Sequence, residues 1–354
     1  MEKMFSRQGK LVWVLLLITS VISCRNTDTD EPYVPPVVTA STPYYLKVPD
    51  GFPQPNLSRQ NPLTVEGIDL GKRLYSDPIL SSNGLSCSSC HMKSLSYSAP
   101  TFNAANGFRF SVPPHVNLAF KTYYNWTGSV EVLDTLCMGD FEAEFFNTNA
   151  ADLYQRLNAH PEYPKMFRKA FGITNLNNLT YHELKIKICY AISQYMRTLV
   201  SADSKFDRYR AQKTSLTEEE YAGMLIFFSE RGDCFHCHSD PLFSDNSFHN
   251  NGLSNVFNGF DKGRTLVTNS DKDLGKFLTP TLRNVARTAP YMHDGRYATL
   301  EQVVEFYNSG VKNSPYIDPI MNKRENISNL QLSDNEKKAL VAFLKTLTDE
   351  EFVK

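Results

Sequence analysis

The sequence predicts an all-helical protein made of two small domains in tandem, with long irregular loops. Three segments combine a helix-capping pattern with apolar residues at helical spacing, and no stretch shows the alternation typical of a sheet. The order of features also repeats: each half has a helical segment, a Cys-x-x-Cys-His motif, irregular chain and then more helix. We therefore expect one domain at residues 59–205 and a second at residues 206–354.

Each of the three helical segments has a Ser or Thr followed three residues later by Glu, the signature of a capping box. The pairs are Thr180 with Glu183, Thr217 with Glu220, and Ser333 with Glu336. The apolar stripes that follow are Leu184, Ile188, Ala191, Ile192, Tyr195 and Leu199; Tyr221, Met224, Leu225 and Phe228; and Ala339, Leu340, Phe343, Leu344 and Leu347. The loops between the helices are long enough to require a large group, such as a cofactor, to organise them.

The composition is that of a soluble globular protein with no strong charge bias. Of the 354 residues, 41% are hydrophobic and 21% are charged, and the formal net charge is −1. The chain has no long basic run, which argues against nucleic acid as a main partner.

The N-terminus has the pattern of an export signal. Three basic residues precede the apolar run LVWVLLLITSVIS, which is short for a membrane span and has the length of a signal-peptide core. The run ends at Cys24 and resembles the lipobox of bacterial lipoproteins, in which this cysteine is lipidated; an ordinary signal peptide with an incidental cysteine is the alternative. We expect a lipoprotein signal peptide at 1–23, a flexible tether rich in Pro, Thr and Asp at 24–58, and a lipid-anchored location in the periplasm or cell envelope.

The chain has seven cysteines, and an exported protein meets an oxidising environment that permits disulfides. Cys24 belongs to the leader, and four others lie in the two Cys-x-x-Cys-His motifs. Cys137 and Cys189 remain. They could pair with each other, or each could be a small buried hydrophobe, and the sequence leaves both alternatives open.

The two Cys-x-x-Cys-His motifs, at 87–91 and 234–238, indicate covalent haem attachment. Zinc could be held by two such pairs, and a thioredoxin-type redox pair needs a βαβ setting that this chain lacks. Only haem attachment requires His directly after the second Cys, because two thiols add to the haem vinyl groups and the histidine binds the iron. We assign Cys87, Cys90, Cys234 and Cys237 as haem anchors, His91 and His238 as iron ligands, and His236 as an outward-facing residue.

The stretch FLTPTLRNVARTAPYMHDGRYATLEQVVEFYNSG, at 277–310, closely resembles the C-terminal domain of bacterial diheme cytochrome c peroxidases, above all their MauG-like relatives. GDCFHCHSDPLFSDNSFHNNGL and NLAFKTYYNWTG fit the same family, and the resemblance covers roughly residues 60–350. It implies two cytochrome c-like domains with one covalent haem c each. The N-terminal domain would then be peroxidatic, and the C-terminal domain would transfer electrons.

The resemblance also implies a sixth ligand for the second haem. The peroxidases place a Met at a set distance after the His of a Pro-Tyr-x-His motif, and MauG-like proteins place a Tyr there. The same distance from His293 leads to Tyr307. Periodicity alone favours Tyr307 as a core aromatic, and Met292 and Met321 are the alternative ligands.

In the first domain, the resemblance implies a haem with an open iron position. Peroxidases that need reductive activation carry a distal His after the first motif. This chain has no His from 92 to 114, and His115 falls where the family is variable. We therefore expect a five-coordinate first haem that is open to peroxide.

Peroxide cleavage needs a carboxylate that moves a proton between the two oxygens. The family uses a Glu after a Gly-Pro turn, and an apparent two-residue deletion makes Glu144 the counterpart here, with Glu142 as the fallback. An ordinary surface carboxylate is the alternative reading of either residue. The family's nearby Gln and Pro are replaced by Leu136 and Asp140.

Two further features follow from the resemblance. Trp126 matches a family Trp between the haems, where an indole offers an electron path, although it could equally pack a domain interface. The family often binds calcium between its domains, partly through backbone carbonyls that match Thr288 and Pro290. The family's side-chain ligand, an Asn, is replaced by Ser111, which makes calcium a weaker expectation.

The sequence thus predicts a diheme peroxidase that reduces hydrogen peroxide to water with electrons from a small redox protein such as a cytochrome c. A MauG-like oxidase that acts on a partner protein is the first alternative, and Tyr307 favours it. A diheme electron-transfer protein with both irons six-coordinate is the second. In each case we expect membrane contact through the lipid anchor only.

Overall fold

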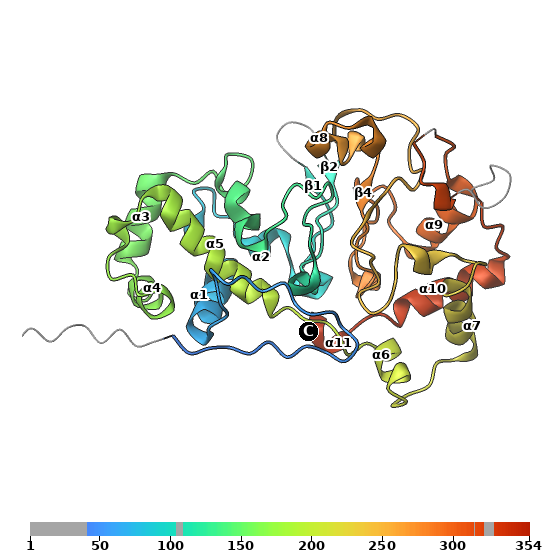
Figure 1. Cartoon of the computed structure of the whole chain (residues 1–354), viewed down its shortest axis with the longest axis horizontal. Coiled ribbons are helices and arrows are strands. Elements are labelled where there is room, and N and C mark those ends of the chain that lie inside the picture. The colour runs from blue at the N-terminus through green and yellow to red at the C-terminus, as the bar shows by residue number, and fades with distance from the viewer. Residues whose placement is uncertain (1–40, 104–108, 315, 322–328) are drawn as a thin grey trace, which may run out of the picture. The chain divides into compact units, whose positions relative to one another are not determined.

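The structure is a computed structural model, shown in Figure 1. It describes residues 41–354 except 104–108, 315 and 322–328. The expected signal peptide, Cys24 and the first part of the expected tether lie outside the described residues. Residues Val38–Lys354 form one compact unit.

The predicted all-helical fold is confirmed. The α-helices are α1 (Val65–Ser76), α2 (Cys87–Cys90), α3 (Ala150–Ala159), α4 (Tyr163–Phe171), α5 (Tyr181–Arg197), α6 (Lys205–Arg210), α7 (Glu218–Phe227), α8 (Thr265–Thr268), α9 (Leu300–Glu305), α10 (Asp334–Lys345) and α11 (Glu350–Val353). The described strands have two residues each and form two antiparallel pairs: β1 (Phe102–Asn103) with β2 (Arg109–Phe110), and β3 (Phe248–His249) with β4 (Phe277–Leu278). Irregular chain and short 3₁₀ turns connect them, as expected for loops arranged around a cofactor.

The three predicted capping boxes all form. In α5, the Thr180 side chain accepts a hydrogen bond from the Glu183 amide, and the Thr180 amide donates to the Glu183 carboxylate at 2.7 Å. The same reciprocal arrangement starts α7 and α10. These helix starts were predictable because the capping contacts are local in sequence.

Each half of the chain has its own hydrophobic core, and in each core two helices meet at a glycine. α1 packs against α5 in the first core, and α7 packs against α10 in the second (Figure 1). A Cβ atom on Gly71 would lie 1.9 Å from the carbonyl oxygen of Ala191, and one on Gly223 would lie 1.9 Å from that of Ala339. Both crossings are therefore backbone contacts that require a residue without a side chain.

The predicted apolar stripe of α7 was only half right, because Met224 and Phe228 pack against the second core but Tyr221 and Leu225 do not. Tyr221 and Leu225 are 45% and 52% exposed, whereas Gly223, Ile226 and Phe227 are buried. The buried face centres on Gly223, where α10 approaches most closely. A stripe chosen by apolar residues alone leaves out the glycine and so selects the neighbouring face.

A 3₁₀ segment, η4 (Leu133–Phe141), is fastened to α5 by two links. Cys137 and Cys189 form a disulfide with a Cα–Cα distance of 5.8 Å, which resolves the alternative that the sequence left open. Asp134 and Arg197 form a buried ion pair, with 2.6 Å between Oδ1 and Nη1. Both links lie within a few residues of Asp140, so the end of η4 has a fixed position.

Residues 41–58 belong to the expected tether, and in the structure they lie along the rest of the protein without forming a helix. The Tyr44 amide donates to the Leu63 carbonyl at 2.9 Å. The Phe52 ring contacts that of Phe120, with 5.2 Å between their centroids. This part of the chain is therefore packed rather than free.

Candidate haem sites

The first motif forms a short helix whose end holds His91. α2 begins at Cys87, and the His91 amide donates to the Cys87 carbonyl at 2.8 Å. The His91 Nδ1 atom lies 2.9 Å from the carbonyl oxygen of Tyr97, to which it donates. This bond fixes the ring and leaves Nε2 as the atom that can bind a metal.

The second motif has the same arrangement on a 3₁₀ turn. The His238 amide donates to the Cys234 carbonyl at 2.9 Å, and His238 Nδ1 lies 3.0 Å from the carbonyl oxygen of Phe243. Both pairs of motif cysteines are free thiols. The two sites therefore offer the same donor set, which is two thiols and one imidazole with a free Nε2.

Burial controls the protonation of both donor sets. It lowers the pKa of His91 to about 4 and also lowers the pKa of His238, so both imidazoles are neutral and able to bind iron. Burial raises the pKa of Cys87 well above its usual value and that of Cys234 to about 12. Protonated, buried thiols suit addition to a haem vinyl group better than binding of zinc, which needs thiolates.

The zinc alternative also lacks the geometry it needs. Among the described residues, the side-chain groups that converge closely enough to hold a metal are Glu230–Asp233–His236 and Asp261–His293–Asp294. Neither group contains a motif cysteine. His236 is only partly buried and hydrogen-bonds to Asp233, away from the donor set that ends in His238.

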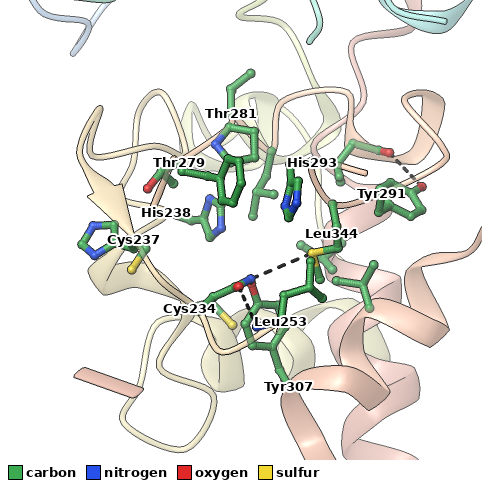
Figure 2. A pocket seen from close by; sticks show the side chains of 18 of the residues that line it. Cys234, Cys237, His238, Leu253, Thr279, Thr281, Tyr291, His293, Tyr307 and Leu344 are labelled. Atoms are coloured by element: carbon green, nitrogen blue, oxygen red, sulfur yellow. Dashed lines mark hydrogen bonds between the residues drawn. The ribbon is translucent and has the colours of Figure 1, made fainter. Parts of the chain in front are cut away.

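Each motif lies at a separate, mainly apolar cavity. The first cavity is lined by Cys87, Cys90 and His91 together with aromatic and aliphatic side chains. Cys234, Cys237, His238, His293 and Tyr307 surround the second, as Figure 2 shows. An apolar cavity with two thiols and one neutral histidine fits the needs of a covalently bound haem.

The structure brings Tyr307 into the second cavity with the second motif. Tyr307 follows α9 in a π-helical turn, and its hydroxyl oxygen accepts a hydrogen bond from Asn251 Nδ2 at 3.0 Å (Figure 2). Burial raises the pKa of Tyr307 to about 12. Met292 and Met321 line the same cavity. Sequence reasoning missed Asn251, because no local pattern links it to a tyrosine so far along the chain.

His115 lies beside His91 and not across the first cavity from it. The two imidazole rings stack with 3.6 Å between their centroids, and His115 Nδ1 hydrogen-bonds to the Tyr75 hydroxyl at 3.0 Å. A ring stacked on His91 cannot at the same time bind the opposite face of an iron held by His91. This placement agrees with an open sixth position at the first site.

The carboxylates near the first cavity differ in their surroundings. Glu144 lines the cavity but is exposed. Glu142 is exposed and pairs with Lys185 at 3.8 Å. Asp140 and Leu136, the two departures from the family pattern, both line the cavity. Burial raises the pKa of Asp140 to about 7.

Trp126 lines both cavities. Its Nε1 atom donates a hydrogen bond to the Ser111 carbonyl at 2.7 Å, and its own carbonyl accepts from the Leu278 amide at 2.8 Å. Both the indole and the backbone of Trp126 are thus held by hydrogen bonds, and Trp126 is one of the residues shared by the linings of the two cavities.

One of the carbonyls expected at a calcium site bonds to Ser111, the residue that stands in place of the family's Asn. Ser111 Oγ donates to the Pro290 carbonyl at 3.1 Å. Calcium takes six to eight oxygen ligands. The direct bond links Ser111 to Pro290 without an ion, and calcium at Thr288 and Pro290 stays a prediction.

Comparison with known proteins identifies the family. The sequence profile of the di-haem cytochrome c peroxidases matches residues 65–215. The chain is 33% identical to the methylamine utilization protein MauG of Methylorubrum extorquens, over 85% of this chain and 83% of that protein. The chain belongs to the di-haem cytochrome c peroxidase family. It is also 30% identical to the cytochrome c551 peroxidase of Nitrosomonas europaea, over 82% of each chain.

Solved structures agree with this family membership. A MauG-like protein associated with microbial copper homeostasis superposes with a TM-score of 0.77 and 30% identity, over 88% of this chain and 97% of that one. The diheme peroxidase BthA of Burkholderia thailandensis shares the fold, with a TM-score of 0.69, 21% identity and coverage of 89% and 96%.

Membership of a di-haem family gives the chain two haem groups, and the two motif cavities are the sites that fit them. Within the described part of the chain, none of the helices combines the length and apolar character needed to cross a bilayer.

Proposed function

We propose that this protein is a diheme peroxidase that reduces hydrogen peroxide to water with electrons from a small redox protein such as a cytochrome c. The observation that carries the proposal is the pair of matching donor sets, each with two thiols and a histidine whose Nε2 is free, in a member of this family. The balanced reaction is H₂O₂ + 2 H⁺ + 2 e⁻ → 2 H₂O.

In this proposal both haems are attached covalently. Cys87 and Cys90 hold the first haem and His91 ligates its iron; Cys234, Cys237 and His238 do the same for the second. When bound, haem supplies the iron at which peroxide is reduced and the path by which electrons arrive. The hydrogen bonds from the two Nδ1 atoms keep the histidine rings oriented and raise their basicity as ligands.

The two sites have different roles. The first cavity receives peroxide in this proposal, which is supported by the stacking of His115 beside His91 and not across the cavity from it. The second transfers electrons, with Tyr307 as the sixth ligand, and Trp126 couples the two sites. The family resemblance makes Glu144 the carboxylate for proton transfer. Its place in the lining of the first cavity supports that role, and its exposure to solvent does not.

A MauG-like oxidase remains the second candidate. In that reading, peroxide oxidises residues of a partner protein by electron transfer through the second site. Tyr307 in the second cavity and the relatives named MauG favour it. A diheme electron carrier needs a sixth ligand at both irons, and the stacking of His115 on His91 argues against His115 as that ligand at the first.

We further propose that the protein is exported and anchored through a lipidated Cys24, on the strength of the leader pattern in the sequence. The direct bond between Ser111 and Pro290 supports a junction of the two halves that does not require calcium.

The test is a steady-state assay of haem-loaded protein with peroxide and a reduced small cytochrome c. We expect peroxide-dependent oxidation of the cytochrome, and a high-spin ferric signal in the EPR spectrum of the resting protein. Reaction of the ferric protein with peroxide but no turnover of the cytochrome supports the MauG-like oxidase. Two low-spin haems and no reaction with peroxide refute both enzymes. Mass spectrometry after denaturation should show two haem additions.

A further inference from the structure

A stretch of the first half is repeated in the second with the same length. Residues 117–140 align with residues 284–307 without a gap. The positions with identical residues are Asn117 and Asn284, Ala119 and Ala286, Tyr124 and Tyr291, Gly128 and Gly295, and Leu133 and Leu300. Trp126 is then the counterpart of His293, and Asp140 is the counterpart of Tyr307.

The backbone repeats as well as the sequence. Tyr124 and Tyr291 each pair with the residue six positions later in an isolated β-bridge. Their hydroxyls donate to equivalent carbonyls, Leu118 at 3.2 Å and Val285 at 3.0 Å. Gly128 and Gly295 adopt φ angles of 65° and 67°. The aligned residues therefore have equivalent structural positions in the two halves as well as similar sequences.

Asp140 and Tyr307 end the repeat at corresponding places. Each lines the cavity of its own half. Each also lies close enough to the motif cysteines of that half to influence their ionisation: Asp140 acts on Cys87 and Cys90, and Tyr307 interacts with Cys234 and Cys237. The position that carries a candidate iron ligand in the second half thus carries a carboxylate in the first.

We infer that Asp140 is the catalytic carboxylate of the first cavity, where it takes the proton-transfer role that the family resemblance assigns to Glu144. The inference rests on the proposed peroxidase function and names the residue that performs its proton transfer. It follows from the repeat: if Tyr307 would ligate the second iron, as proposed, then Asp140 holds the corresponding position in the cavity of the first.

The surroundings of Asp140 suit a group that is kept available for a substrate. Among the residues that the structure describes, none donates a hydrogen bond or forms an ion pair with its carboxylate, although the side chain is mostly buried and faces the cavity. The Cys137–Cys189 disulfide fixes the segment that carries it. Glu144 lies four residues after Asp140, outside this segment, and is exposed.

The charge state of Asp140 fits the same role. Burial raises its pKa from 3.8 to about 7, so at neutral pH the carboxylate can both accept and return a proton. The titratable groups that Asp140 acts on are Cys87 and Cys90, which lose their thiols on haem attachment, and the buried Tyr75, whose pKa is raised mainly by burial. Lys121, whose pKa burial lowers to about 8, lines the same cavity.

The step can be written with atoms and electrons balanced. Asp140 accepts the proton of one peroxide oxygen and returns it to the other oxygen, which already carries one hydrogen. The O–O bond then breaks, its electron pair goes to the oxygen that now carries two hydrogens, and that oxygen leaves as water. The remaining oxygen becomes the second water when it takes up two electrons from the donor protein and two protons from solvent, and Asp140 ends the cycle ionised as it began.

The experiment compares Asp140→Asn and Glu144→Gln in haem-loaded, full-length protein, with Glu131→Gln as a control at an exposed position outside both cavities. In stopped-flow mixing of ferric protein with peroxide, Asp140→Asn should slow the reaction by about 10²–10⁴-fold. Asp140→Glu, which keeps the carboxylate, should recover part of the rate. Glu131→Gln should match the wild type.

A second readout does not depend on turnover. Azide binding to the ferric first haem at pH 8 should tighten by roughly tenfold or more in Asp140→Asn, because the variant removes a negative charge beside the anion. Asp140→Ser serves both readouts if the Asn variant does not load haem. The inference is wrong if the Asp140 variants react with peroxide and bind azide as the wild type does. It is also wrong if the slower reaction with peroxide appears in Glu144→Gln and not in Asp140→Asn. If wild-type protein does not react with peroxide, the proposed function fails, and azide binding still decides the position of Asp140.

Discussion

At the scale of single residues, the two copies of the repeated stretch (residues 117–140 and 284–307) share residues that hold the backbone and differ at residues that can take part in chemistry. The residues that are identical in the two copies form turns or internal contacts, as Tyr124 and Tyr291 do. Two positions that differ line the cavities: Trp126 where the second copy has His293, and Asp140 where it has Tyr307. One backbone design can therefore support an open site in one half and a ligated site in the other.

Asp140 should lower the stability of the folded protein at neutral pH. Its pKa is about 7 in the folded state and near 3.8 when exposed, so the folded state binds more protons between these values. The effect of Asp140 on stability is therefore least unfavourable in acid, and its cost grows as the pH rises through about 7. We expect Asp140→Asn to raise the free energy of unfolding by ~1–4 kcal/mol at pH 8 and to change it little at pH 4. Calorimetry of the haem-loaded protein at both values tests this, and a lower melting temperature of the variant at pH 8 would contradict it.

Tyr307 should set the potential of the second haem. An anionic oxygen ligand favours ferric iron, whereas Met ligation raises the potential. Tyr307→Met should therefore raise the reduction potential of this haem in a spectroelectrochemical titration and leave the first haem unchanged. Met292→Leu is the matched control in the same cavity. If the control shifts the potential and Tyr307→Met does not, Met292 is the ligand.

Some site residues could be predicted from the sequence, and others could not, for a physical reason. Haem attachment requires two thiols and a histidine within five residues, so Cys234 and His238 are visible as a motif. Asn251 reaches Tyr307 only through the fold. Asp140 has no local signature either, and its burial depends on how η4 is fastened to α5.

At the scale of elements, helix starts were predictable and helix faces only partly so. A capping box is a contact within four residues, and all three predicted boxes form. The buried face of α10 was also correct, because large apolar residues fill it. The face of α7 was only half right, because its centre is Gly223, which has no side chain to reveal it.

The two glycine crossings should therefore be sensitive to one added methyl group. Alanine at Gly71 or Gly223 gains about 1 kcal/mol of helix propensity, but its Cβ would meet a backbone carbonyl that cannot move alone. We expect each substitution to lower the free energy of unfolding by about 1–3 kcal/mol, in line with overpacked cores. Gly139→Ala is the control, because a Cβ there has open space around it. Chemical denaturation measures the difference, and equal stability of all three variants would show that the helices can separate at no cost.

At the scale of the whole molecule, a small number of direct hydrogen bonds connects the two halves beside the cavities. The Ser111 amide donates to the His293 carbonyl at 2.9 Å, and Ser111 Oγ donates to the Pro290 carbonyl. Trp126 adds one more, because its carbonyl accepts from the Leu278 amide. In the sequence, the residues of this junction were singled out as parts of an expected calcium site. The sequence could not show that the Ser111 hydroxyl would donate a hydrogen bond directly to the Pro290 carbonyl.

Removal of calcium should therefore leave the protein unchanged. Excess chelator should alter neither the ferric spectrum nor the melting temperature, and added calcium should not restore or raise either one. Ser111→Ala deletes the hydroxyl that bonds to the Pro290 carbonyl and should cost about 1 kcal/mol, the usual value of one hydrogen bond. Ser111→Asn replaces it with an amide oxygen that can bind a cation. If the melting temperature depends on calcium only in Ser111→Asn, the serine is the residue that prevents calcium binding in the wild type. If the wild-type protein already responds to chelator, a calcium ion joins the two halves and replaces the direct bond between Ser111 and Pro290.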